Sequence, residues 1–167
     1  MRICLLIAII FAAISCSDNQ EKNIRQEAAS FADSLLILST YPKEIVGTWV
    51  ANSLRVDVQG DSAYQIYVAK NEWQSKLNRQ PFKTTFRENN TYQIDYLDLN
   101  DSLIEKRRGV WNIFGDTLLL IENEATYQYA IKMKRNHLQY QATLDWDDDQ
   151  EVDDIYTQID EKMIKKD

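Results

Sequence analysis

The feature that most constrains the fold is a period-two alternation of apolar and polar residues, which runs through most of the chain after Glu44. The clearest example is residues 138–146, where apolar side chains occupy every second position. Successive side chains of a strand point to opposite faces, so this pattern predicts strands with one buried face. Turn residues such as Gly115-Asp116 separate one alternating stretch from the next.

About nine or ten short strands are expected on this basis. No helical pattern of 10–15 residues alternates with them, which argues against a parallel α/β sheet. The spacing indicates an all-β fold, either an antiparallel sandwich or an antiparallel barrel. Residues 70–80 are polar and carry Trp73 and Leu77 four apart, which predicts a short helix or a long loop. The main predicted strands are residues 64–68, 82–86, 92–96, 103–114, 118–121, 125–133, 138–146 and 152–159.

The chain before Glu44 has a different period. Apolar residues there step by four and three positions, which predicts a helix over residues 18–40 with one apolar face. The dipeptide Tyr41-Pro42 is expected to end it. The apolar face either packs on the β domain or binds a partner near a membrane. It consists of Ile24, Ala28, Phe31, Leu35 and Leu38.

The first residues have the pattern of a signal peptide. Arg2 precedes an apolar run over residues 3–14, which is shorter than the about 20 residues that a spanning helix needs. The run ends in Ala13-Ile14-Ser15-Cys16, which resembles the bacterial lipobox. That resemblance implies cleavage before Cys16 and a lipid anchor on this cysteine. The alternative is ordinary cleavage at the same place, leaving a free thiol.

Three segments follow from these patterns: a signal peptide over residues 1–15, a tether and helix over 16–43, and a β domain over 44–160. A lipid on Cys16 implies attachment to the cell outer membrane. Asp18, close behind the cysteine, resembles the surface-export signals of Bacteroidetes lipoproteins, and this leaves the periplasmic and the surface side both open.

Composition excludes several classes of protein. The net charge is −7, which argues against binding nucleic acid and against electrostatic docking on anionic lipid. Cys4 and Cys16 are the only cysteines, so the β domain has neither a disulfide nor a thiolate metal site. An apolar content of 44% excludes a disordered chain.

The sequence carries no recognisable catalytic motif, so we do not expect an enzyme. His137 is the single histidine, and its place beside a turn indicates a solvated side chain. The four glycines are scattered and form no phosphate-binding loop, and no serine lies in a nucleophile elbow. The charge run Lys106-Arg107-Arg108 is interpreted as a solvated strand edge.

Two tryptophan motifs point to a family. Gly47-Thr48-Trp49 resembles the G-x-W motif of lipocalins. A second one, Gly109-Val110-Trp111, opens a stretch that continues into Gly115-Asp116-Thr117-Leu118 and resembles a hairpin of the lipocalin-like lipoproteins of Bacteroidetes, which are calycin-type barrels. The resemblance covers about residues 44–158.

This resemblance implies an up-and-down β-barrel of about eight strands whose interior can hold one small ligand. It implies that Trp49 plugs one end. Lipocalins proper also pack an arginine across this tryptophan, for which Arg135 is the candidate here. The cysteine pair of many secreted lipocalins is missing.

Aromatic residues on the predicted strand faces either fill the barrel or line a cavity with polar handles. Two functions follow: binding of a small apolar or amphipathic ligand, or a filled barrel that acts as a structural or interaction protein for an envelope partner. Tyr64 shares the pattern of these aromatic residues. The candidate ligand-binding residues are Trp49, Tyr92, Tyr96, Trp111, Tyr127, Tyr129 and Tyr140.

Residues 145–154 contain seven acids and no base. Asp145, Asp147 and Asp149 match the start of a D-x-D-x-D calcium loop, and Asp153 is a candidate fourth ligand. Gln150 stands in place of the turn glycine of such loops, and Tyr156 in place of their closing glutamate. The sequence therefore leaves two interpretations, a weak calcium site and a solvated acidic hairpin tip.

Overall fold

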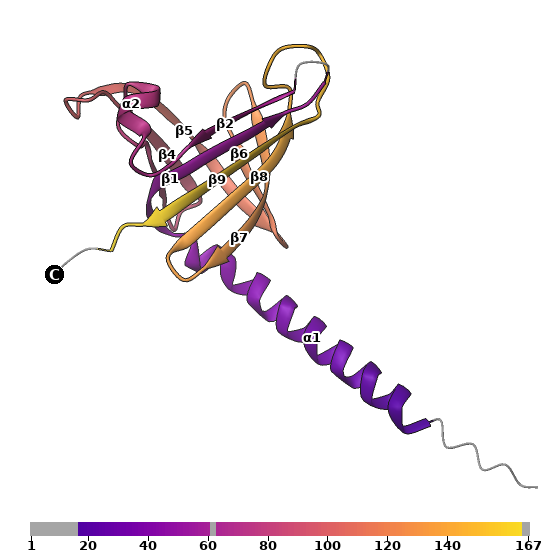
Figure 1. Ribbon diagram of the computed structural model, residues 1–167. Helices are drawn as coiled ribbons and strands as arrows, with labels where there is room; N and C mark the ends of the chain where they lie inside the picture. The colour runs from indigo at the N-terminus through magenta and orange to yellow at the C-terminus, as the bar shows by residue number, and fades with distance from the viewer. Residues whose placement is uncertain (1–16, 61–62, 165–167) are drawn as a thin grey trace, which may run out of the picture. The chain divides into compact units, whose positions relative to one another are not determined.

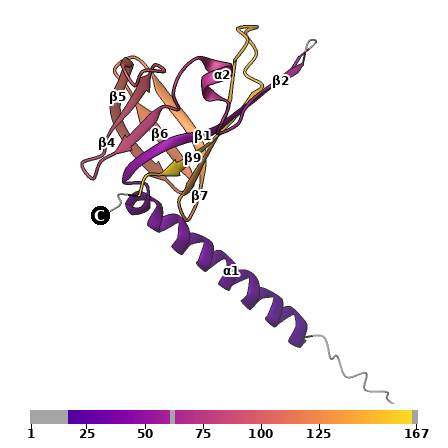
Figure 2. The same ribbon diagram turned by 60° about the vertical axis from the view of Figure 1, so that its left-hand side comes forward.

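The chain folds into a closed antiparallel β-barrel, which is one of the two all-β folds that the alternation indicated and the one that the family resemblance implied. The computed structural model describes residues 17–60 and 63–164. Its nine strands form one sheet in the order β2-β1-β3-β4-β5-β6-β7-β8-β9, and pairing of β1 with β9 closes the sheet (Figure 1). Figures 1 and 2 both show β1 and β9 side by side. The choice between sandwich and barrel is thereby settled in favour of the barrel.

The strands follow the predicted segments closely, and residues 103–114 match an observed strand from end to end. Neighbours along the chain from β3 to β9 pair in sequence, which is the up-and-down arrangement. The bounds are β1 Gly47–Val58, β2 Tyr64–Val68, β3 Lys83–Phe86, β4 Thr91–Leu97, β5 Leu103–Phe114, β6 Thr117–Ile121, β7 Thr126–Lys134, β8 His137–Leu144 and β9 Asp154–Lys162.

One strand lies outside the barrel because β1 divides one of its edges between two partners. Its first residues, from Gly47 to Val50, pair with β3, and its last residues, from Leu54 to Val58, pair with β2. The register shifts between Ala51 and Ser53 on the β9 side, which marks a bulge. The apolar-face prediction for Tyr64 is wrong, since this residue on β2 is 48% exposed.

Buried aromatic side chains close one end of the barrel, and we call Trp49, Phe86, Tyr92 and Trp111 the closed end. Trp49 is 1% exposed, and its Nε1 donates to the carbonyl of Ile45 at 2.7 Å. Phe86 packs edge-on against Trp111 with ring centroids 5.8 Å apart. The expected plug at Trp49 is therefore part of a larger aromatic layer.

The chain contains two helices in its described part, α1 (Ser17–Glu44) and α2 (Trp73–Leu77). α1 continues through Pro42, so the predicted end at Tyr41-Pro42 is wrong. Proline removes only its own N–H, and the bond from Ile45 N to Tyr41 O at 2.9 Å holds the last turn. Neither helix combines the length and apolar character that a transmembrane span requires.

The chain divides into two compact units, Met1–Ile37 and Leu38–Asp167, and the barrel belongs to the second. The apolar face predicted for the helix falls on side chains outside the described part, so its packing stays a prediction. These side chains are Ile24, Ala28, Phe31, Leu35 and Leu38. The predicted signal peptide and Cys16 also lie outside the described residues.

Candidate ligand cavity inside the barrel

A cavity of about 240 Å³ lies among the inward-facing side chains of strands β3 to β9. The strands position these side chains by alternation, since every second residue of a barrel strand points inward. Its lining residues are Phe82, Thr84, Ile94, Tyr96, Arg107, Leu120, Tyr127, Tyr129, Tyr140, Leu144, Trp146, Tyr156 and Gln158.

The cavity separates the seven aromatic candidates into two groups. Four of them line it: Tyr96, Tyr127, Tyr129 and Tyr140. The other three, Trp49, Tyr92 and Trp111, are buried in the closed end and do not line it. A role for any of the seven in ligand binding stays a prediction.

Aromatic rings form one continuous wall of this cavity. Tyr129 contacts Tyr140 edge-on with centroids 5.7 Å apart and lies 6.2 Å from Tyr156. Tyr156 in turn stacks on Trp146 at 6.4 Å. Burial raises the pKa of Tyr129 to about 12, so its hydroxyl stays protonated at neutral pH and can donate. Trp146 and Tyr156 were not among the candidates of the sequence analysis.

A charge pair borders the cavity, and Arg107 is its member that lines the cavity. Arg107 Nη2 lies 2.8 Å from Glu122, its guanidinium covers the Tyr127 ring at 4.6 Å, and the Tyr92 hydroxyl donates to Glu122 at 2.7 Å. The prediction of a solvated strand edge for Lys106-Arg107-Arg108 is thus wrong for the middle residue. Alternation along β5 turns Arg107 inward, while its two neighbours are exposed.

Besides the tyrosine hydroxyls and the Arg107–Glu122 pair, the site has a third polar group, the carboxyl of Asp160, which is not itself a lining residue. Asp160 is fully buried, and Gln158 Nε2 donates to its Oδ1 at 2.6 Å. Tyr156 donates its hydroxyl to Gln158 Oε1, which extends the chain of bonds. Burial raises the pKa of Asp160 to about 7, although the interactions with Gln158 and with the Tyr140 hydroxyl act in the opposite direction.

Sequence reasoning missed this group because it treated the last strand as residues 152–159. The strand runs over Asp154–Lys162, and its inward face is the polar one. Asp154 is the first residue of this strand. Its carboxylate accepts hydrogen bonds from the backbone N–H of Gln59 at 2.9 Å and from that of Trp146 at 2.7 Å. The sequence does contain a pattern that indicates this inward face. The polar residues Asp154, Gln158 and Asp160 lie an even number of positions apart, whereas Ile155, at an odd position between them, is exposed.

The cation across the plugging tryptophan is a lysine. Lys162 pairs with Trp49 across the β1–β9 closure, and its Nζ lies 5.0 Å from the centroid of the indole ring. The same Nζ donates to the carbonyl of Glu44 at 2.5 Å. Arg135, the candidate from the family resemblance, instead occupies the exposed β7–β8 turn with φ 55°.

The acidic stretch forms the loop between β8 and β9, as predicted. Carboxylate oxygens of Asp145, Asp147 and Asp149 lie within 4.8 Å of one another. Gln150 adopts φ 77°, the left-handed conformation that the replaced glycine would favour. Asp153 is not part of this group. The pKa of Asp153 is raised, mainly by burial and further by nearby negative charges, those of Asp149 and Asp147 among them.

These contacts are compatible with either interpretation of the loop. Asp145 Oδ2 accepts from the backbone N–H of Gln150 and Asp149 Oδ1 from that of Glu151, so part of the carboxylate capacity is used within the loop. Calcium binding by Asp145, Asp147, Asp149 and Asp153 stays a prediction.

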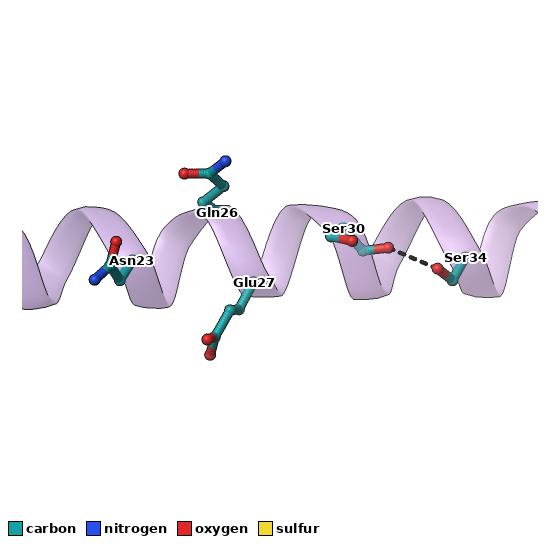
Figure 3. Close-up of a pocket in the computed structure, with 5 residues that line it drawn as sticks. All are labelled: Asn23, Gln26, Glu27, Ser30 and Ser34. Atoms are coloured by element: carbon teal, nitrogen blue, oxygen red, sulfur yellow. Dashed lines mark hydrogen bonds between the residues drawn. The ribbon is translucent and has the colours of Figure 1, made fainter.

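A second hollow lies on α1 and has a different character. Figure 3 shows five polar side chains on this helix, and the one hydrogen bond drawn among them runs from Ser34 Oγ to the carbonyl of Ser30. All lining residues come from one helix: Asn23, Gln26, Glu27, Ser30 and Ser34. A single helix is convex and offers no opposing wall, so the barrel cavity is the better candidate site.

Comparisons of the sequence with protein-family models and with curated proteins found no match. The barrel agrees with the fold that the tryptophan motifs implied, but the assignment to lipocalin-like lipoproteins stays a prediction from those motifs.

Proposed function

We propose that this protein is a lipid-anchored barrel of the bacterial cell envelope that binds one small ligand in its cavity. The observation that carries the proposal is the cavity of about 240 Å³ with its aromatic wall. Binding sites are typically concave, mostly apolar and supplied with a few polar groups. The volume is below the roughly 300–1,000 Å³ of sites for drug-sized molecules, which favours a compact ligand over a long acyl chain.

The polar groups favour an amphipathic ligand over a purely apolar one. Tyr96 and Tyr129, which carry hydroxyl groups, line the cavity together with Arg107, whose guanidinium is paired with Glu122. A buried polar group that loses water without gaining a partner costs free energy, so a ligand must offer hydrogen bonds at some of these points.

Native mass spectrometry of the protein purified from its own host tests ligand binding. We expect a bound small molecule, and its loss in a Leu144→Trp variant, whose added ring enters the cavity. Thr143→Trp is the matched control, because this neighbouring residue of β8 is exposed on the outer face. A ligand-free protein, or equal occupancy in both variants, contradicts the proposal.

The membrane anchor is tested separately at Cys16. We expect Cys16→Ser to release the protein from membranes and to block lipid labelling, since a diacylated cysteine supplies enough apolar chain for stable attachment. Membrane association that survives the substitution would contradict the anchor while leaving ligand binding open.

A second candidate function is interaction with an envelope protein through the outer face of the barrel. Val110 on β5 and Ile121 on β6 are directly paired and both exposed, and Phe114 nearby on β5 is 62% exposed. Exposed apolar groups of this kind favour a protein contact. Crosslinking in the envelope from position 114 distinguishes this role, because a ligand carrier needs no specific partner there.

A further inference from the structure

The most unusual group near the cavity is the carboxyl of Asp160. Charged side chains are almost never fully buried unless they are paired, and this one is 0% exposed. The described residues place no cation within ion-pair distance of it. Its Oδ1 accepts from Gln158, and its other polar contact among the described residues is with the hydroxyl of Tyr140.

The hydroxyl of Tyr140 is a polar neighbour of this carboxyl: burial raises the pKa of Tyr140, and the interaction with Asp160 raises it further. Tyr140 lines the cavity and is 5% exposed, and among the described residues its hydroxyl has no hydrogen-bond partner besides this contact with Asp160. The β8–β9 register pairs Tyr140 with Gln158 and places Asp160 one inward-facing position deeper, beside Leu138. The Asp160 carboxyl therefore lies directly beyond the cavity residues Tyr140 and Gln158, as a floor.

Charges elsewhere in the barrel do not compensate this carboxyl. Arg107 is held by Glu122 at 2.8 Å and by the face of Tyr127, so its charge is already balanced. An anionic ligand would have to displace Glu122 from this pair. A cationic ligand meets no such competitor at the floor, and the rings of Tyr129, Tyr140 and Tyr156 present the aromatic surroundings that favour ammonium groups.

We propose that the ligand of the cavity is a small aromatic amine, whose ammonium group binds at the floor formed by Tyr140 and Asp160. The inference rests on the proposed ligand-binding function and specifies its ligand class. The Tyr140 hydroxyl donates its proton to the Asp160 carboxylate and accepts a hydrogen bond from the ammonium group, so the free lone pair of the hydroxyl gains a partner. The aromatic ring of the ligand packs against the wall of Tyr129 and Tyr156. The hydrogen bonds of the ammonium group to Tyr140 and of Tyr140 to the Asp160 carboxylate each involve a charged group, and such bonds are stronger than those between neutral groups.

Three probes with the same ring test the proposal: 2-phenylethylamine, 2-phenylethanol and 3-phenylpropionate. Binding is followed by calorimetry and by intrinsic tryptophan fluorescence, to which the cavity residue Trp146 contributes. At about pH 8, where the amine is protonated and Asp160 is mostly ionised, we expect the amine to bind about tenfold or more tightly than the alcohol. We expect the carboxylate to bind no better than the alcohol.

Two variants assign this preference to the floor. Asp160→Asn keeps the shape and an acceptor for Gln158 but removes the charge, and we expect the preference for the amine to disappear. Tyr140→Phe removes the hydroxyl alone and is expected to reduce the preference. Asp101→Asn is the matched control, because it removes an exposed carboxyl from a left-handed position that asparagine also adopts, and it should leave the preference unchanged.

Other results would overturn the inference. Equal binding of amine and alcohol, a preference for the carboxylate, or an amine preference that survives Asp160→Asn would each contradict an ammonium site at the floor. In those cases a probe still binds, and ligand binding by the cavity stands. Binding of no probe also overturns the aromatic amine, and the native mass spectrometry then judges the proposed function independently.

Discussion

The closed end and the cavity are built from the same residue types, tyrosine and tryptophan, but their polar atoms are treated differently. At the closed end, Trp49 donates to Ile45 O, Trp111 donates to Arg87 O at 3.2 Å, and Tyr92 donates to Glu122. At the cavity floor, the Tyr140 hydroxyl has the buried carboxyl of Asp160 as its polar neighbour, and no cation of the described residues lies within ion-pair distance of that carboxyl.

The difference indicates that the closed end and the cavity floor have different roles in the barrel. Buried polar groups are normally paired, and an unpaired one costs about 1–3 kcal/mol. The closed end avoids this cost and stabilises the fold. The floor instead buries a carboxyl without a cation, which is the arrangement expected if the proposed amine binds there. Three experiments test this comparison, and a fourth tests the acidic loop beyond the cavity.

The largest effect is expected at the closed end. Trp49→Ala removes a side chain that is 1% exposed and leaves a cavity, so we expect a loss of about 3–5 kcal/mol in the free energy of unfolding. Denaturant unfolding measures it. Trp146→Ala at the cavity is the control, because this ring is 40% exposed and its loss should cost much less. Similar losses in both variants would remove the distinction between the two regions.

The next effect is the pH dependence that Asp160 gives to stability. Its pKa rises from 3.8 in the unfolded chain to about 7 in the folded protein. Protonation therefore favours the folded state: this contribution is complete below about pH 4 and is lost as the pH rises through about 7. Its full size is about 4 kcal/mol at most.

Unfolding of Asp160→Asn across this pH range measures the contribution. We expect the substitution to raise stability relative to wild type progressively from pH 4 to pH 8, because the buried charge no longer forms. Asp101→Asn should follow the wild-type profile, since its carboxyl is exposed. Parallel pH profiles for Asp160→Asn and wild type would show that the floor carboxyl is not a buried acid.

A smaller loss is expected at Gly109, which faces Tyr92 across the β4–β5 pair of the closed end. A Cβ at this position would lie 2.1 Å from the carbonyl oxygen of Ile121 and 2.8 Å from the Tyr92 ring. We expect Gly109→Ala to cost about 1–3 kcal/mol or more, because neither the backbone nor a buried ring moves freely. Val110→Ala, on the exposed outer face, should cost less. Equal thermal unfolding of both variants would show that the closed end tolerates repacking.

The smallest effect is expected at the acidic loop beyond the cavity. If Asp145, Asp147 and Asp149 bind calcium, the dissociation constant should be about 10⁻⁴–10⁻³ M, as in extracellular modules. Titration calorimetry is compared with an Asp147→Asn/Asp149→Asn variant and with Asp101→Asn as the control outside the loop. Calcium heat that is missing, or that the double variant retains, would leave the loop as a solvated hairpin tip.

Period-two alternation by itself determined the fold class and most strand positions. Burial of one face is a local property that the sequence displays, so residues 103–114 were predicted from end to end and the β5–β6 turn at Gly115-Asp116 was placed correctly. The same alternation identified the inward tyrosines Tyr127, Tyr129 and Tyr140.

Partners across strands were decided only by the tertiary structure. Lys162 lies over Trp49 because β9 closes the barrel against β1, a contact between residues 113 positions apart that no local pattern contains. Arg107 and Asp160 face inward because the register places them there, against the expectation that charged side chains are solvated. The sequence determined which faces are apolar, whereas barrel closure decided which few charges those faces enclose, because that depends on pairing between distant strands.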